Sequence, residues 1–128
     1  MKNGGIHMNL EKANQLYEHS KTLYDLCDIK KEIAEIEQIL AMPVLNVYSA
    51  RQKIGTINEK HPEIFFIHAL LYRLKNPYAP NIPPESVDNA SDSGLRSDLS
   101  WKRDYLTAKG KTTCLDELYK YLKKKYNL

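Results

Sequence analysis

Apolar residues in the first third of the chain repeat at the α-helical period and change face part-way along. Residues 9–41 contain neither Pro nor Gly, and Asn9 can cap the start of a helix. At about 100° per residue, the apolar side chains before residue 25 share one face, whereas those of residues 29–40 lie roughly opposite. We favour two helices that meet at Cys27–Asp28, with Asp28 capping the second. One long helix, whose second face would contact a partner subunit, is the alternative and would predict a homodimer.

Two further helices are expected in the middle of the chain. Apolar residues in 43–59 recur at helical spacing. Gly55 makes a helix here less stable by about 1 kcal/mol than Ala would. Residues 44–48 could instead form a short strand. Pro62 favours the first position of the next helix, residues 62–75. Apolar side chains surround that helix on nearly all sides, which is typical of a buried helix, so we expect it to be the centre of the core.

Residues 76–94 differ in kind from the rest of the chain. They contain four of the six prolines, followed by a Ser- and Asp-rich run. A stretch of this length without helical or strand periodicity is typical of a functional or disordered loop, so we expect a long Pro/Ser-rich loop. Ser93 or Gly94 can then cap a helix that runs to about Lys109, and Gly110 is placed to close it. Thr112 or Thr113 can cap a last helix.

Length and composition fit one globular unit. The chain has 128 residues, of which 42% are hydrophobic and 27% charged, which is close to the average for soluble domains. We therefore predict an all-α fold: a compact single-domain bundle of about five or six helices over residues 9–128. Residues 1–8 are interpreted as a tail that could be a cloning scar.

Cysteine usage and hydropathy bear on the compartment. Cys27 and Cys114 are far apart and form no CxxC pair, which favours a reduced, cytoplasmic protein over one with a long-range disulfide. No apolar run approaches the roughly 18 residues of a membrane span. The N-terminal residues also lack the apolar stretch of a secretory signal. We therefore expect no membrane association.

The sequence offers little that would support catalysis. His61 and His68 share a helix face, but only Glu63 lies near them, and a zinc site needs three or four closely spaced ligands. The chain has no GxSxG elbow, P-loop or GxGxxG motif. We expect no metal, no cofactor and no enzymatic activity. A site built from distant His, Cys or Tyr residues stays open as a further possibility.

The C-terminal third is the most suggestive region for binding. Residues 96–128 carry 9 Lys/Arg and 4 Asp/Glu, within a chain of net charge +3. Trp, Tyr and Arg are enriched at binding hot spots. We therefore predict a helical module that binds and regulates another protein by steric occlusion, in the manner of immunity proteins, antitoxins, secretion chaperones or inhibitors. The predicted contact residues are Arg96, Trp101, Arg103, Tyr105 and, in the loop, Tyr78.

The alternative prediction is a nucleic-acid-binding protein. Lysines interleaved with aromatic residues can follow a phosphate backbone and stack on bases, although a net charge of only +3 argues against this. The residues that would make these contacts are Lys102, Arg103, Lys109, Lys111, Lys120, Lys123, Lys124 and Lys125.

Overall fold

A computed structural model describes residues 4–23, 26–77, 91–112 and 114–128, and it confirms an all-α bundle. Most of the expected loop at 76–94 lies outside these residues. In the described part the chain forms six helices: α1 (Gly4–Leu23), α2 (Leu26–Ala41), α3 (Val47–Lys60), α4 (Ile64–Lys75), α5 (Asp92–Lys109) and α6 (Leu115–Lys125). None of these helices is both long enough and apolar enough to cross a membrane.

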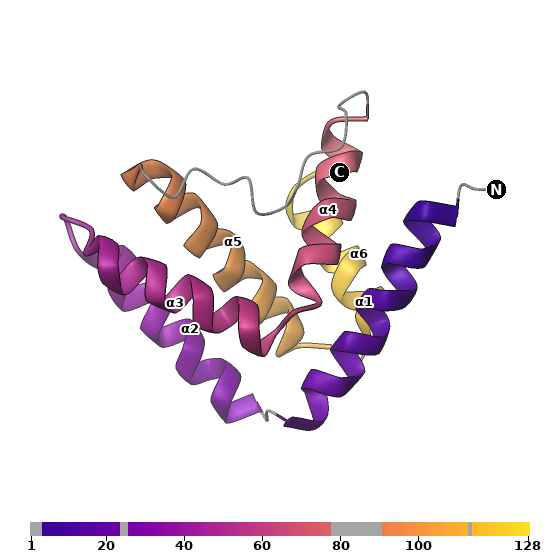
Figure 1. Cartoon of the computed structure of the whole chain (residues 1–128), viewed down its shortest axis with the longest axis horizontal. Coiled ribbons are helices and arrows are strands. Elements are labelled where there is room, and N and C mark those ends of the chain that lie inside the picture. Colours follow the sequence, from indigo (N-terminus) through magenta and orange to yellow (C-terminus); the bar gives the residue numbers. More distant parts are fainter. Residues whose placement is uncertain (1–3, 24–25, 78–90, 113) are drawn as a thin grey trace.

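The helices form two groups that meet at an angle, so that the molecule is V-shaped in projection (Figure 1). One group consists of α2, α3 and α5, which pack against one another. The other group is α1 with α4 and α6. Helix α5 also packs on α6 and so joins the groups near the vertex of the V.

The predicted break between the first two helices is confirmed. Helix α1 ends at Leu23 and α2 begins at Leu26, two residues before the expected cap, so Asp28 lies in the first turn of α2. A carboxylate there still complements the helix dipole. Because Tyr17 of α1 and Ile36 of α2 are both fully buried within this chain, the change of apolar face requires no partner subunit. The single long helix was the wrong alternative.

Helix α5, and not the predicted α4, is the central helix of the core. Leu95, Leu99 and Leu106 of α5 are fully buried, whereas Leu74 of α4 is 45% exposed. The sequence pattern did not indicate this, because α5 also buries charged side chains, including Lys102. From sequence alone, a charged side chain in a helix is expected to be exposed. The prediction for residues 62–75 was therefore right about the helix and wrong about its place.

Local capping explains where several helices begin. The Asn46 side chain accepts a hydrogen bond from the Ser49 amide (3.0 Å), so α3 starts at Val47 and the alternative of a strand at 44–48 is wrong. The Ser91 hydroxyl accepts from the Gly94 amide (3.0 Å), which places the start of α5 at Asp92. Such side-chain caps satisfy amides that have no partner within the helix.

Arg96, one of the predicted contact residues, closes the C-terminal end of α2. Its guanidinium donates to the carbonyls of Leu40 and Met42, each at 3.0 Å, and to the Asp92 carboxylate at 2.7 Å. The last carbonyls of a helix have no partner within it, and a cation there also complements the helix dipole. The predicted contact of Arg96 with a partner stays a prediction, and its side chain is 29% exposed.

Replacing Arg96 tests this role. We expect Arg96→Ala to lower the free energy of unfolding by about 1–3 kcal/mol, because it removes charged hydrogen bonds. Arg96→Lys should be nearly as destabilising, because a single ammonium cannot span the same acceptors. Urea unfolding measures both, with exposed Lys120→Ala as the control. A lysine variant as stable as the natural protein would contradict this assignment.

Candidate functional site

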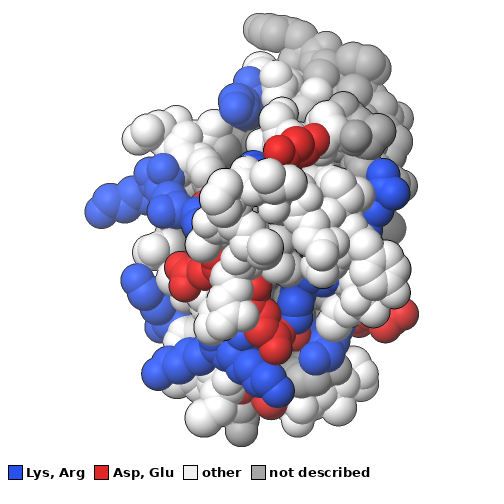
Figure 2. All heavy atoms as spheres, turned by 90° about the vertical axis from the view of Figure 1, so that its left-hand side faces the viewer, with Lys and Arg blue, Asp and Glu red and all other residues white. Residues whose placement is uncertain are grey.

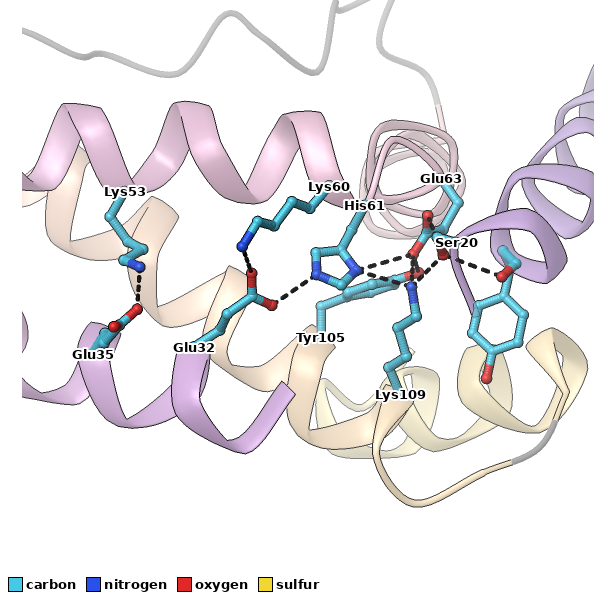
Figure 3. Close-up of polar contacts among 10 residues, drawn as sticks. Ser20, Glu32, Glu35, Lys53, Lys60, His61, Glu63, Tyr105 and Lys109 are labelled. Carbon is cyan, nitrogen blue, oxygen red and sulfur yellow. Dashed lines mark hydrogen bonds and ion pairs between the residues drawn. The ribbon is translucent and has the colours of Figure 1, made fainter. Parts of the chain in front are cut away.

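A cluster of polar side chains is buried where the two helix groups meet (Figure 3). It draws on α1, α2, the α3–α4 connection and α5, and none of its members is more than 4% exposed. We call it the buried polar centre, and it consists of Ser20, Glu32, His61, Glu63, Tyr105 and Lys109. Buried polar groups are stable only when their hydrogen bonds are satisfied, so the partners of each group decide what the centre does.

The Lys109 ammonium is the hub of this centre. Its Nζ lies 2.6 Å from Ser20 Oγ, 2.7 Å from Glu63 Oε2 and 2.9 Å from His61 Nδ1. An ammonium has three N–H donors, and these three acceptors use all of them. Glu63 Oε2 also accepts from the Tyr105 hydroxyl at 2.6 Å. Both members of the Lys109–Glu63 ion pair thus make further hydrogen bonds, Lys109 with Ser20 and His61, and Glu63 with Tyr105.

The hydrogen bonds assign one neutral form to His61. Because its Nδ1 accepts from Lys109, its Nε2 carries the proton and donates to Glu32 Oε1 at 2.8 Å. Glu32 also forms an ion pair with Lys60, at 3.4 Å between Oε2 and Nζ. Two carboxylates are therefore matched by two ammonium groups, of which Lys109 is buried and Lys60 is 39% exposed.

The electrostatics follow from this geometry. Burial lowers the pKa of Lys109, and the Glu63 carboxylate opposes that change. Burial acts to raise the pKa of Glu32, but His61 and Lys60 outweigh it, so the pKa falls below its ordinary value. Burial raises the pKa of Tyr105 well above its ordinary value, and Glu63 adds to this effect. Tyr105 therefore remains a hydrogen-bond donor at neutral pH.

The centre's position favours a structural role. Ser20 beside Lys109 and His61 beside Glu32 are pairs that could perform proton transfer if a substrate reached them. However, Ser20 is only 1% exposed and His61 is fully buried. These side chains line neither the pocket beside Trp101 nor the hollow between α2 and α3. The contacts instead tie α1, α2 and α5 to the α3–α4 connection.

Sequence reasoning missed the buried polar centre. His61 is the C-cap of α3, but the role of its side chain was not foreseen. Glu63 and Lys109 are 46 positions apart, and Glu32 and His61 are 29 apart. The available signal was Lys109 itself, which lies 14 positions after Leu95 and three after Leu106, on the apolar face of its helix.

An accessible pocket lies between α4, α5 and the C-terminal residues. Its volume is about 410 Å³. We call it the aromatic pocket, and it is lined by His68, Leu71, Tyr72, Lys75, Asn76, Trp101, Tyr126 and Leu128. A second hollow of about 370 Å³ between α2 and α3 is lined mainly by polar side chains, including the ion pair of Glu35 with Lys53 (Figure 3).

Trp101 is the organising side chain of the aromatic pocket. It is half-buried and packs against the core. Its ring centroid lies 5.4 Å from that of His68, 5.8 Å from Tyr105 and 6.2 Å from Tyr126, with tilted planes. Tilted aromatic pairs at these distances are favourable. Burial and the nearby Lys102 lower the pKa of His68, so its ring is neutral at neutral pH.

Known proteins provide no guide to these sites. Comparisons with protein families, curated proteins and solved structures find no match for this chain. Its function must be inferred from the side chains themselves. Within the described residues, no three His, Cys, Asp or Glu side chains are grouped in a way that could hold a metal ion.

The predicted protein-binding residues divide into three groups. Trp101 lines the aromatic pocket, and Arg103 is one-third exposed beside Asp104 (3.4 Å). Tyr105 is fully buried, so its prediction as a surface anchor is wrong: α5 is covered on that side by the α3–α4 connection. Tyr78 lies outside the described residues.

Two of the predicted nucleic-acid contacts are also wrong. Lys102 is buried and paired with Asp98 at 2.6 Å, and Lys109 is the hub of the buried polar centre. Both lie on the buried side of α5, where neither can reach a phosphate. Lys111 and Lys123 lie over the rings of Tyr121 and Tyr119, each 5.2 Å from the ring centroid. Of the other four residues of this set, Lys120, Lys124 and Lys125 are exposed, and Arg103 is one-third exposed.

Proposed function

We propose that this chain is a non-enzymatic helical module that binds and regulates another protein, with the aromatic pocket as its principal recognition site. The observation that carries this proposal is the half-buried Trp101 in an accessible pocket of about 410 Å³. Recognition pockets of this size, lined by aromatic side chains with a few polar groups, are typical of binding sites.

The proposed mechanism is steric occlusion. A large apolar side chain of the partner enters the aromatic pocket, while Arg103 at the edge of α5 pairs with an acidic group nearby. Trp and Arg side chains supply much of the energy at such interfaces. Once bound, the helical bundle covers the functional surface of the partner. The reactive groups of the buried polar centre support a non-enzymatic role, because they hold helices together below the surface.

Trp101→Ala tests the proposal. We expect this variant to lose a partner that the natural chain retains in a pull-down from its host, with a loss of about 2 kcal/mol or more in binding free energy. Tyr48→Ala is the matched control, because Tyr48 is an aromatic residue 74% exposed on α3, away from the pocket. Circular dichroism checks that both variants remain helical. Retention of the partner by the Trp101 variant would contradict the proposal.

Nucleic-acid binding through α6 is the second candidate. This candidate is supported by the basic last turn of α6 and by Tyr119 and Tyr121 on the same helix. The opposing observation is that two of the predicted lysines are buried. On the side of the molecule that carries the α2–α3 connection, both signs of charge are interspersed (Figure 2). Steep loss of affinity with rising salt would favour this candidate.

The cysteines support a cytoplasmic location as part of the same proposal. Cys27 is exposed and Cys114 half-buried, and both are free thiols. Exposed free thiols persist most readily in a reducing compartment.

A further inference from the structure

The aromatic pocket contains a histidine whose hydrogen-bonding groups are unused. His68 of α4 lines the pocket, and its ring centroid lies 5.4 Å from that of Trp101. Within the part of the chain that the structure describes, the His68 ring forms no hydrogen bond. Neither of its nitrogens is among the described side-chain atoms that are fully buried without a hydrogen-bond partner. The nitrogens of this half-buried ring are therefore accessible to a ligand in the pocket.

The polar groups that the pocket offers beside this ring are uncharged. Burial lowers the pKa of His68, and Lys102 adds to this effect while Asp98 opposes it. A neutral imidazole has one N–H donor and one acceptor nitrogen. Asn76 also lines the pocket, and its Nδ2 donates to the Tyr72 carbonyl at 3.3 Å, which leaves the amide oxygen without a partner among the described residues. The pocket thus presents a donor and acceptors that no residue in the described ranges uses.

Charge does not select the occupant, because the pocket carries both signs. Lys75 is exposed in the last turn of α4, and the α-carboxylate of Leu128 belongs to the same lining. Trp101, Tyr72 and Tyr126 supply aromatic walls. A further ring packs against tilted rings of this kind at little conformational cost. The pocket therefore suits an uncharged ring that carries a hydrogen-bonding group.

Among aromatic side chains, a phenol matches these groups best. A hydroxyl both donates and accepts, so it can pair with either nitrogen of His68. A tryptophan N–H can only donate, and a phenylalanine ring does neither. A phenylalanine in the pocket would exclude water from His68 and leave its ring without a partner, which is unfavourable.

We propose that the aromatic pocket recognises a tyrosine of the partner protein, with the ring against Trp101 and the hydroxyl hydrogen-bonded to His68. This inference rests on the proposed function, because it specifies which side chain of the partner enters the pocket. Tyrosine fits the large apolar side chain expected there, since its body is apolar and only its tip is polar. His68 then sets the preference for tyrosine over phenylalanine, and Trp101 supplies affinity.

The chain carries its own reporter for the experiment, because Trp101 is its single tryptophan. Its fluorescence is titrated with two capped peptides, Gly-Tyr-Gly and Gly-Phe-Gly. We expect saturable binding of the tyrosine peptide, about fivefold to tenfold tighter than that of the phenylalanine peptide, as one added hydrogen bond provides. His68→Phe keeps a ring beside Trp101 and removes both nitrogens, so it should bind the two peptides equally. His19→Phe, on an exposed residue of α1, is the matched control and should keep the preference. Circular dichroism checks that both variants remain helical.

Several outcomes would overturn the inference. Equal binding of the two peptides to the natural chain would remove the role of the hydroxyl, and an unchanged preference in His68→Phe would remove the role of His68. Binding of p-cresol without binding of the tyrosine peptide would replace the protein partner with a small phenol. If neither peptide binds but the pull-down still requires Trp101, the tyrosine assignment fails while the proposed function stands. If neither peptide binding nor the pull-down depends on Trp101, both fail.

Discussion

Lys109→Met lowers the free energy of unfolding by about 3–5 kcal/mol, because removing one partner from a buried ion pair leaves the other charge uncompensated. Glu63 is fully buried and pairs with Lys109 at 2.7 Å. Ser20 and His61 also lose the donor that they share. Domains of this size have total stabilities of roughly 5–15 kcal/mol, so the variant approaches the limit of folding.

The matched double variant separates charge from packing. Lys109→Met with Glu63→Gln leaves no unpaired buried charge between these two positions, and we expect it to recover a large part of the lost stability. The nearby exposed Lys111→Met should change stability by less than about 0.5 kcal/mol. Urea and thermal unfolding measure all three variants. If the double variant is as unstable as Lys109→Met alone, the charge explanation is wrong.

Leu99→Ala is expected to lower the free energy of unfolding by about 2–5 kcal/mol, the range for a leucine truncated inside a packed core. Leu99 is fully buried on α5, the helix that packs against α2, α3 and α6. The neighbouring side chains cannot close the space without moving several helices, because each is held by contacts of its own.

Leu74→Ala provides the comparison on α4. Leu74 is 45% exposed, so its truncation removes little buried surface and should cost less than about 1 kcal/mol. Unfolding in urea, with circular dichroism as the signal, compares the two leucines directly. A larger loss from Leu74→Ala than from Leu99→Ala would restore α4 as the centre of the core.

Tyr105 connects the buried polar centre to the aromatic pocket. Its hydroxyl donates to Glu63, and its ring lies 5.8 Å from that of Trp101. A variant that loosens the centre can therefore displace a wall of the pocket without touching any pocket residue directly. For this reason, binding experiments on variants of the buried polar centre need a folding measurement beside them, whereas Trp101→Ala acts within the pocket itself.

Local patterns along the chain were enough to predict the helices. The apolar period located all six, and the reversal of the apolar face between Tyr17 and Ile36 located the break between α1 and α2. Asn46 starts α3 a few residues later than predicted. These features are local: they depend on residues within a turn or two of one another. The prediction of a tail at residues 1–8 is wrong for residues 4–8, because α1 begins at Gly4 and not after Asn9.

Local patterns could not predict which charged side chains are buried, because this depends on the packing of distant segments. A lysine in a helix has the same sequence pattern whether it is solvated or paired with a carboxylate from a distant segment, and Lys109 meets Glu63 across 46 positions. Trp101 was predicted to be a binding residue, but the pocket around it requires α4 and the C-terminal residues to converge. Contacts between residues far apart in the sequence depend on how the helices cross. The apolar periodicity of one helix does not specify how that helix crosses another.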